Sequence, residues 1–240
     1  MNFAGQRILV VGGTSGIGAG IAAAFAAQGA QVVATGATPQ EREAADARAP
    51  GAGIEHHTLD VRDGAAVQSF VEGLGELHAV VCCAGVIRRG AELDPAVFAE
   101  VVDINLNGTM RVAAAARPAL KATKGCLVHT ASMLSFFGGG LVPGYSASKG
   151  GVAQLTKSLA IAYAADGIRV NAVAPGWIAT PLTQALQDDA ARSGQILGRT
   201  PLGRWGTPAD VAGPVLFLCS PAAAFVTGVV LPVDGGYLIA

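Results

Sequence analysis

The chain has 240 residues, of which 51% are hydrophobic and 14% charged, and its formal net charge at pH 7 is −1. A chain of this length can bury a sizeable core, and α/β chains of this size commonly form one domain. The small net charge and the scattered Lys and Arg residues leave no electrostatic footprint for nucleic acid, so polyanion binding is excluded as a main activity.

Strands and helices are predicted to alternate along the whole chain. Apolar and β-branched runs indicate strands at 7–11, 30–35, 54–59, 78–83, 125–130, 168–174 and 227–233. Helices are indicated between them, at about 17–28, 41–48, 63–74, 95–122, 145–165 and 208–219. The helix after the second strand is expected to be abbreviated because segment 35–53 is short. The alternation predicts an α/β fold with a doubly wound, seven-stranded parallel sheet and helices on both faces.

A glycine-rich turn follows the first predicted strand. The run Gly12-Gly13-Thr14-Ser15-Gly16-Ile17-Gly18 comes directly after Val11 and leads into an Ala-rich helical segment. A strand, a glycine turn and a helix together present backbone N–H groups and a positive helix end to a pyrophosphate. The spacing differs from the commoner Gly-x-Gly-x-x-Gly fingerprint, so a plain strand-to-helix connection remains an alternative.

Two residue patterns argue against other enzyme classes. His56 and His57 are neighbours in a predicted strand and face opposite sides of it, so a shared metal site with Asp60 is not expected. Ser132 lies outside any Gly-x-Ser-x-Gly nucleophile elbow, which argues against a hydrolase. We therefore expect no metal in the site.

Tyr145 and Lys149 stand four residues apart at the start of a predicted helix, so both side chains lie on one face. A phenol titrates near ~10 in isolation, and a fixed cation beside it favours the phenolate. The pair therefore has the outline of a general acid/base, with Ser132 upstream as a hydroxyl partner. Taken alone, the same spacing equally fits a surface Tyr and Lys on an ordinary helix.

The stretch 178–206 interrupts the alternation after the sixth predicted strand. Ligands of open parallel sheets bind at the carboxyl ends of the strands, so we interpret this stretch as a substrate lid. The uncharged stretch 211–233 is long enough to span a bilayer, but three prolines and Gly228 interrupt it. We predict a helix end, a turn and a final strand there, and no membrane segment.

The amino-terminal residues show no basic start followed by an apolar stretch, so no secretory signal is indicated. Four cysteines stand at 82, 83, 126 and 219, and two of them are adjacent within a predicted strand. We interpret them as buried thiols of a cytoplasmic protein.

Together, these motifs resemble the short-chain dehydrogenase/reductase family along the whole chain. The matching segments are 11–18, Asp60-Val61, Cys83-Ala84-Gly85, 105–108, Ser132, Tyr145 with Lys149, 175–180 and 233–236. The resemblance implies a single Rossmann domain over 1–240, a homotetramer, and hydride transfer between a nicotinamide dinucleotide and a secondary alcohol or ketone. A dinucleotide-binding regulatory or scaffold protein of the same fold remains the non-enzyme alternative.

The resemblance implies a catalytic role for Asn105, Ser132, Tyr145 and Lys149. Tyr145 would exchange the hydroxyl proton and Ser132 would hold the same oxygen. Lys149 would lower the pKa of Tyr145 and bind the nicotinamide ribose, while Asn105 would hold a water in a proton relay to Lys149. Taken alone, Ser132 could cap a turn and Asn105 could be an ordinary helix residue.

The cofactor-binding residues that the resemblance implies come from several segments. They are Gly12, Thr14, Ser15, Gly16, Ile17, Gly18, Asp60, Val61, Cys83, Ala84, Gly85, Tyr145, Lys149, Pro175, Gly176, Ile178 and Thr180. Two positions depart from the family: Cys82-Cys83 replaces the usual Asn-Asn, and Val11 replaces the usual Thr. The weakly hydrogen-bonding thiols predict a less rigid junction after the fourth strand.

The choice between NAD and NADP rests on residues 33–38, which offer neither an acid for the ribose diol nor a cation for a 2′-phosphate. Ser15 stands where some NADP enzymes of the family have a base, although Thr38 or Arg42 could still meet a phosphate. We favour NAD because no cation is clearly placed to balance the extra charge.

Segments 85–89, 131–139, 203–206 and 233–238 are similar to the deoxy-ketogluconate and gluconate dehydrogenase branch of the family. Arg88, with Arg89 beside it, could offer a guanidinium fork to the carboxylate of a sugar acid, or could be a solvated surface residue. Met133, Trp177 and Trp205 are the other substrate-contact candidates. The aromatic residues could equally line an apolar pocket, so a 3-oxoacyl thioester reductase or a cyclic ketone reductase remains open.

Overall fold

The computed structural model describes residues 1–48, 51 and 53–240. Seven strands form one sheet in the order β3-β2-β1-β4-β5-β6-β7, and each neighbouring pair is parallel. The strands are β1 (Arg7–Val11), β2 (Gln31–Gly36), β3 (Ile54–Thr58), β4 (Ala79–Cys82), β5 (Cys126–Thr130), β6 (Arg169–Pro175) and β7 (Val230–Val233). The predicted α/β class and the doubly wound, seven-stranded parallel sheet are confirmed.

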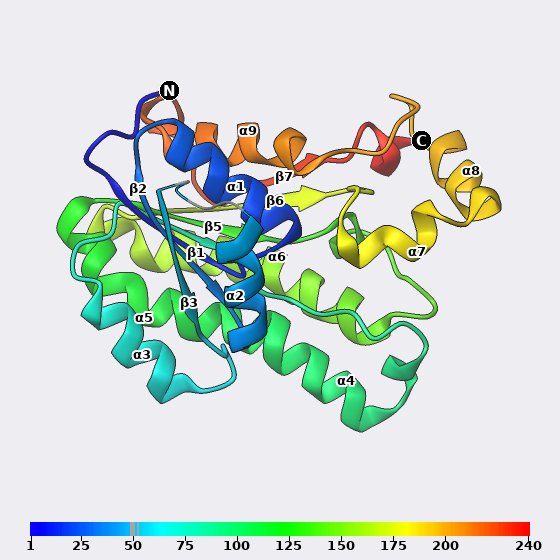
Figure 1. Cartoon of the computed structure of the whole chain (residues 1–240), viewed down its shortest axis with the longest axis horizontal. Coiled ribbons are helices and arrows are strands. Elements are labelled where there is room, and N and C mark those ends of the chain that lie inside the picture. Colours follow the sequence, from blue (N-terminus) through cyan, green and yellow to red (C-terminus); the bar gives the residue numbers. More distant parts are fainter. Residues whose placement is uncertain (49–50, 52) are drawn as a thin grey trace.

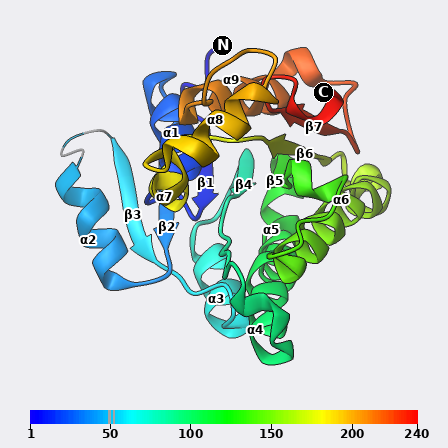
Figure 2. The same cartoon turned by 90° about the vertical axis from the view of Figure 1, so that its right-hand side faces the viewer.

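Helices cover both faces of the sheet (Figures 1 and 2). On one face α1 (Gly16–Ala27) packs against α9 (Pro208–Cys219). On the other face lie α3 (Gly64–Gly73), α5 (Gly108–Thr123) and α6 (Pro143–Tyr163). Helix α2 (Pro39–Arg48) lies against β2 and β3. It was expected to be abbreviated, but it spans 10 residues, as many as α3, and residues 49, 50 and 52 lie outside the described residues.

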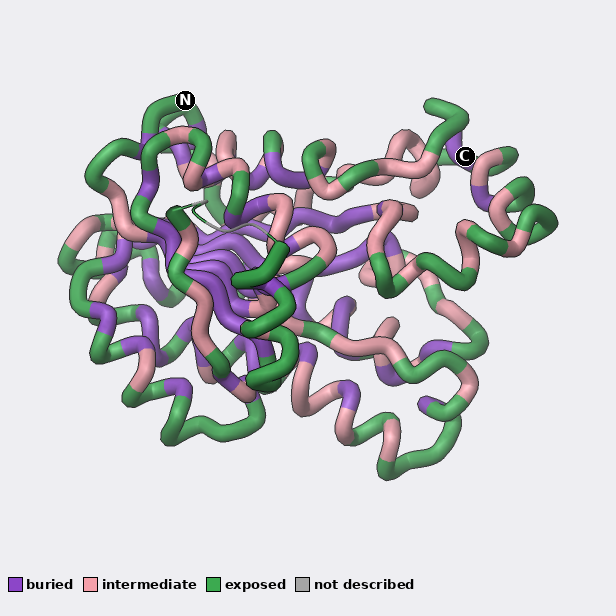
Figure 3. Tube along the Cα trace, viewed as in Figure 1, coloured by how far each residue is buried: buried purple, intermediate pink, exposed green. Residues whose placement is uncertain are grey.

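The strands between the two edges of the sheet are buried on both sides because alternate side chains enter different cores (Figure 3). Leu9 and Val11 of β1 belong to the cluster beneath α3, α5 and α6, whereas Ile8 and Val10 belong to the cluster beneath α1 and α9. This period of two is what a strand between two helical layers requires. Each such fully buried aliphatic side chain contributes roughly 1.5–3 kcal/mol, so the sheet forms a rigid base for the site.

The strand order reverses next to β1, whose neighbours are β2 on one side and β4 on the other. Val11 is in register with both Thr35 and Cys82, so these three strands end together. A crevice at the carboxyl ends of the strands forms at such a reversal, and ligands of this fold class bind there. The glycine turn and the Cys83-Ala84-Gly85 segment both begin at this place.

One predicted helix differs from the structure. The segment 95–122 is not continuous: α4 (Pro95–Val102) and α5 are separated by a π-helical turn at Asp103–Asn107. Such turns bend a helix and often occur at functional sites. The turn carries Asn105 into the interior, where its side chain is fully buried.

The stretch 178–206 contains α7 (Gln184–Gln187) and α8 (Ala190–Gly198) and projects beyond the carboxyl ends of the strands (Figure 1). Its two ends pair with each other, since Ala179 N donates to Gly206 O and Gly206 N donates to Trp177 O. In the uncharged stretch 211–233 the structure has the expected end of a helix, a turn and β7. None of the helices in the described residues has the length and apolar composition needed to cross a membrane.

Candidate active site

The glycine turn brings the backbone of β1, α1 and the β4 loop into close contact. A side-chain carbon on Gly12, whose φ is +79°, would lie 2.4 Å from Ala84 N, and one on Gly18 would lie 2.1 Å from Gly12 O. Both distances are far inside van der Waals contact, so only glycine fits at either position. The turn therefore leaves its backbone N–H groups and the N-terminus of α1 open toward a ligand, which fits a pyrophosphate.

A cleft of about 550 Å³ lies over this turn at the carboxyl ends of the strands. Most of the predicted cofactor residues line it: Gly12, Thr14, Ser15, Gly16, Ile17, Gly18, Asp60, Val61, Cys83, Ala84, Gly85, Tyr145, Lys149 and Thr180. Pro175 and Gly176 are not among its walls, and Ile178 lines a separate cavity of about 480 Å³. Both the glycine turn and the predicted acid/base pair therefore face one cleft.

Tyr145 and Lys149 extend from the first two turns of α6 into this cleft. Lys149 Nζ lies 5.6 Å from the centroid of the Tyr145 ring and donates a hydrogen bond of 2.6 Å to Thr130 O. Ser132 follows β5 and is buried, and its Oγ accepts from Leu134 N at 3.1 Å. The neighbouring Ser135 donates to Lys149 O at 2.7 Å, which ties the β5 loop to α6.

The pKa values of this pair are governed by burial. Burial raises the pKa of Tyr145, the Ser132 hydroxyl opposes that rise, and the charge of Glu92 adds to it. Burial also lowers the pKa of Lys149 from 10.5 to about 8. The expected lowering of the Tyr145 pKa is not found in the protein alone: desolvation of the phenol is the largest effect and raises it. The group that opposes the rise is the Ser132 hydroxyl, while Lys149 Nζ donates to Thr130 O.

Asn105 connects the β4 loop to α6. Its Oδ1 accepts from Val86 N at 2.8 Å, and its Nδ2 donates to Val86 O and to Ser148 Oγ, both at 3.0 Å. Ser148 Oγ in turn donates to Tyr145 O at 2.7 Å. These bonds give Asn105 a positioning function, while its role in a water-mediated relay stays a prediction.

The junction after β4 is tied together in spite of its two cysteines. Cys83 N donates to Val11 O at 2.7 Å, and Cys83 Sγ accepts from Thr130 Oγ1 at 3.3 Å. Burial raises the pKa of both the Cys82 and the Cys83 thiol, so they stay protonated. All four cysteines are free, with Cys82 and Cys126 fully enclosed and Cys83 and Cys219 partly so.

Asp60 lines the cleft and is held by Arg62, whose Nη2 donates to Asp60 Oδ2 at 2.6 Å. This hydrogen bond lowers the pKa of Asp60, which stays ionised. Val61 beside it is buried against Gly108, where a side-chain carbon would lie 2.6 Å from Val61 Cγ2. The predicted Asp-Val pair is thus one polar and one apolar wall of the cleft.

Glu41 is a cleft residue that the sequence reasoning missed. Its carboxylate turns back from the first turn of α2 and accepts from Ala37 N at 2.7 Å. A side-chain carbon on Gly36 would lie 2.9 Å from Glu41 Oε2, so this carboxylate lies where a side chain at the end of β2 would extend. The signal in the sequence was the Thr-x-x-Glu signature of a capping box at Thr38 and Glu41. Half of that box forms, since Thr38 Oγ1 accepts from Glu41 N at 3.2 Å, but the carboxylate accepts from Ala37 N.

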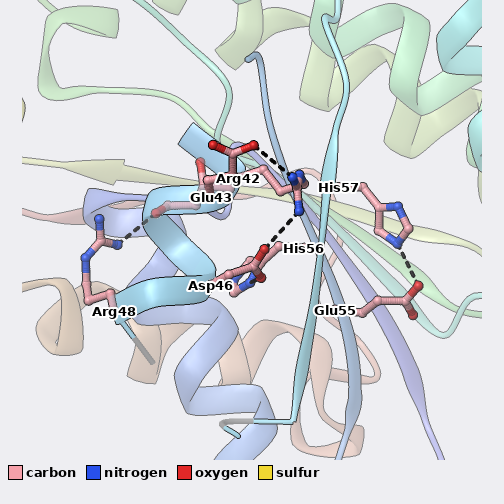
Figure 4. Close-up of polar contacts among 8 residues, drawn as sticks. Arg42, Glu43, Asp46, Arg48, Glu55, His56 and His57 are labelled. Atoms are coloured by element: carbon pink, nitrogen blue, oxygen red, sulfur yellow. Dashed lines mark hydrogen bonds and ion pairs between the residues drawn. The ribbon is translucent and has the colours of Figure 1, made fainter. Parts of the chain in front are cut away.

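The two arginines of α2 are engaged elsewhere (Figure 4). Arg42 pairs with Glu43 at 3.2 Å and with Asp46 at 3.1 Å, and it is not a wall of the cleft. Arg48 donates to Thr14 O at 2.9 Å. Thr38 does line the cleft, so only one of the two residues expected to meet a phosphate is in reach.

His56 and His57 have separate partners, as their opposite orientation predicts (Figure 4). His56 Nδ1 lies 2.9 Å from Asp46 Oδ1, and His57 Nε2 lies 2.7 Å from Glu55 Oε1. In the part of the chain that the structure describes, no three His, Cys, Asp or Glu side chains are grouped in a way that could hold a metal ion.

The four predicted substrate residues do not come together. Arg88 lines the cleft and lies 3.7 Å from Glu100, while Met133 is buried. Trp177 and Trp205 pack edge to face with their centroids 6.0 Å apart. Trp177 lines the separate cavity with the lid, and Trp205 Nε1 donates to Ser193 Oγ at 2.9 Å. In this structure the two tryptophans therefore pack on each other and contact the lid, and they do not line the cleft.

The fold and the cleft define a dinucleotide-dependent oxidoreductase: a glycine cradle fits a pyrophosphate, and the half-buried phenol of Tyr145 and the buried amine of Lys149 line the same cleft. A family model described as "Enoyl-(Acyl carrier protein) reductase" matches residues 11–238. The chain is 39% identical over 245 residues to 2-dehydro-3-deoxy-D-gluconate 5-dehydrogenase from Pseudoalteromonas atlantica, covering 98% of this chain and 96% of that protein. It is 37% identical over 243 residues to the 3-oxoacyl-[acyl-carrier-protein] reductase from Escherichia coli, covering 98% of each.

Among solved structures, the chain is similar to a putative NAD(P)-dependent gluconate 5-dehydrogenase from Beutenbergia cavernae with bound NADP. The TM-score is 0.92 at 39% identity, covering 100% of this chain and 99% of that one. This protein belongs to the short-chain dehydrogenase/reductase family. It is accordingly an NAD(P)-dependent oxidoreductase acting on a CH–OH group.

Proposed function

We propose that this protein interconverts a secondary hydroxyl and a ketone on a sugar acid. The observation that carries the proposal is the placement of Tyr145 and Lys149 in the same cleft as the glycine turn. The named activities of the relatives, deoxy-ketogluconate and gluconate dehydrogenation, support the substrate class. The cofactor, when bound, accepts or supplies the hydride at the carbinol carbon.

The roles of the chain's own residues follow from their environment. Tyr145 takes or gives the hydroxyl proton, and Ser132 holds the same oxygen by a hydrogen bond. Burial lowers the pKa of Lys149 to about 8, so its amine gains and loses a proton near neutral pH. Lys149 can therefore pass a proton to Tyr145 or take one from it. Because the pKa of Tyr145 is raised in the protein alone, added positive charge in the cleft is needed to favour the phenolate.

We favour NAD over NADP as the cofactor, although the solved relative carries NADP. Glu41 supplies a carboxylate at the end of β2, where an acid can bond a ribose diol. A 2′-phosphate there would meet this negative charge, while Arg42 is already paired with two acids. Ser15 adds no positive charge on the opposite wall.

Arg88 supports the choice of an acidic substrate, and the lid can cover the apolar part of a substrate. Arg88 is exposed at the cleft wall and its guanidinium lies 3.7 Å from Glu100, so it can turn toward a carboxylate. Leu182 of the lid lines the cleft and is 62% exposed, so the lid offers apolar cover that a substrate could bury. A 3-oxoacyl thioester is the second candidate, favoured by the similarity to the E. coli reductase.

The experiment is a turnover screen of sugar acids, cyclic alcohols and acyl thioesters with NAD and NADP, followed by NADH fluorescence. Turnover of a sugar acid supports the proposal, and turnover of acyl thioesters alone would replace it with the second candidate. Cofactor binding without any turnover across the panel would favour a regulatory or scaffold protein.

We further propose that the whole chain, 1–240, forms one domain with 178–206 as its lid, and that it acts in the cytoplasm as a homotetramer. A single sheet shared by both cores supports one domain, and the four free thiols support a reducing compartment. Ile161 of α6 and Phe225 are 81% and 106% exposed, so other subunits have apolar surface to cover. Light scattering that gives a monomer at micromolar concentration would contradict the tetramer.

A further inference from the structure

Glu92 is a buried acid for which no role has yet been described. It lies in the 3-10 turn Ala91–Leu93 after the β4 loop, and it is only 1% exposed. Within the described residues it has no ion-pair partner. An enclosed carboxylate is costly unless hydrogen bonds compensate for the lost water, so its contacts require an explanation.

Both oxygens of Glu92 accept from backbone amides of the active site. Oε1 accepts from Arg88 N and Oε2 accepts from Tyr145 N, each at 2.7 Å. These are short, charge-assisted bonds, which are stronger than neutral ones. One side chain therefore joins the loop that walls the cleft to the residue that carries the phenol.

The bond to Tyr145 meets a need of the catalytic helix. α6 begins at Pro143, which has no N–H, and its N-cap Val142 offers no side-chain cap within the described residues. The amides of the first helical turn lack intrahelical partners, and an acid at this end also favours the helix dipole. Glu92 thus caps α6 from another element, at the residue on which the chemistry depends.

Tyr145 is consequently held at both ends of its backbone unit. Its N–H donates to Glu92, and its carbonyl accepts from Ser148 Oγ, which Asn105 holds. The carboxylate of Glu92 also packs closely on the backbone before Tyr145, because a side-chain carbon on Gly144 would lie 3.3 Å from Glu92 Oε2. Loss of the Glu92 bond would free one of the two ends.

We propose that Glu92 is a positioning residue that fixes Tyr145, and hence the phenol, against the cleft wall. The proposal rests on the proposed function of Tyr145 as acid/base. Glu92 does not touch the reacting atoms. It acts by holding the backbone of Tyr145, and its charge also contributes to the raised pKa of the phenol.

Three variants separate positioning from general stability. Glu92→Gln keeps the shape but removes the charge and places an NH₂ group against a backbone N–H. Glu92→Asp keeps the charge but shortens the reach. Asp94→Asn is the matched control, because Asp94 caps the neighbouring α4 through Ala96 N at 2.8 Å and that helix carries no catalytic side chain.

We expect Glu92→Gln and Glu92→Asp each to lower kcat roughly 10- to 100-fold, the cost of misplacing a reacting group by about 1 Å. NADH affinity should stay within about twofold, and Asp94→Asn should keep the parental kcat even if its Tm falls. An ultraviolet titration of the phenols, read against Tyr145→Phe, should give a lower pKa for Tyr145 in Glu92→Gln and the parental pKa in Glu92→Asp.

The phenol titration needs no substrate, so it remains informative if the sugar-acid proposal fails. A parent without turnover would reject the proposed function alone. A parental kcat together with an unchanged Tyr145 pKa in Glu92→Gln would overturn the positioning role of Glu92. A loss of kcat in Asp94→Asn equal to that in the Glu92 variants would overturn it as well. If Glu92→Gln does not fold, a parental kcat in folded Glu92→Asp has the same meaning.

Discussion

His129 couples the stability of this protein to pH between 6.5 and about 4. Its imidazole is fully buried in β5, with Nδ1 2.9 Å from Thr156 Oγ1. Because Thr156 Oγ1 donates to Val152 O, Nδ1 carries the proton, and Nε2 has no partner in the described residues. Burial, reinforced by the charge of Lys149, lowers the pKa of His129 from 6.5 to about 4.

The sign and the size follow from linkage. Below pH 6.5 the unfolded chain takes up a proton at this position before the folded chain does. The free energy of unfolding therefore decreases as the pH is lowered. At 1.36 kcal/mol per pKa unit, the difference between the unfolded and folded pKa values of His129 corresponds to roughly 3 kcal/mol of stability in total. About 2 kcal/mol of this is lost between pH 7 and 5, and the remainder by pH 4 and below.

The assay is urea unfolding at one fixed protein concentration, at pH 7 and pH 5. His129→Phe removes the titrating group while Thr156 keeps its bond to Val152 O. We expect its loss of stability between these pH values to be about 2 kcal/mol smaller than that of the parent. Leu127→Ala, a change in the same strand that removes no titrating group, is the control and should show the parental difference between the two pH values. An identical pH dependence in parent and His129→Phe would refute the reasoning.

Two further predictions concern the cofactor. Glu41→Gln should lower the NAD-to-NADP ratio of kcat/KM by roughly tenfold, since a charged hydrogen bond of about 1.5–3 kcal/mol is lost. The control Glu43→Gln, on the outer side of α2, should not change this ratio. An unchanged ratio in Glu41→Gln would count against the role of Glu41 in cofactor choice. Gly18→Ala should abolish NADH binding in a fluorescence titration, because the added carbon would lie 2.1 Å from Gly12 O. Gly73→Ala is the control, because the added carbon would meet no atom within 4 Å, and this variant should bind NADH normally. NADH binding by Gly18→Ala would contradict the proposed role of the glycine turn.

The alternation of strands and helices was predictable because the central strands are continuous apolar runs that enter two cores and several of the intervening turns contain glycine. The glycine turn and the Tyr145 and Lys149 pair were also predictable, since their spacing is local. The π-helical turn at Asp103–Asn107 was not, because a single inserted residue leaves the helical pattern of 95–122 almost unchanged.

Contacts between distant segments account for the remaining differences. Glu92 and Tyr145 are 53 residues apart, and nothing in the local pattern of either predicts their bond. Glu41 was hidden for a different reason, since its capping box indicates a helix start and not the direction of its carboxylate. The pKa of Tyr145 was predicted in the wrong direction because burial of the phenol cannot be read from the spacing of two residues.

The central claim is that the phenol of Tyr145, beside Lys149 and over the glycine turn, moves the proton of the reaction. The most direct measurement is kcat of Tyr145→Phe at saturating cofactor, with NADH affinity measured on the same sample. The account predicts a loss of turnover with nearly unchanged NADH affinity, because only the hydroxyl is removed and the half-buried ring stays in place. Substantial remaining turnover would contradict it.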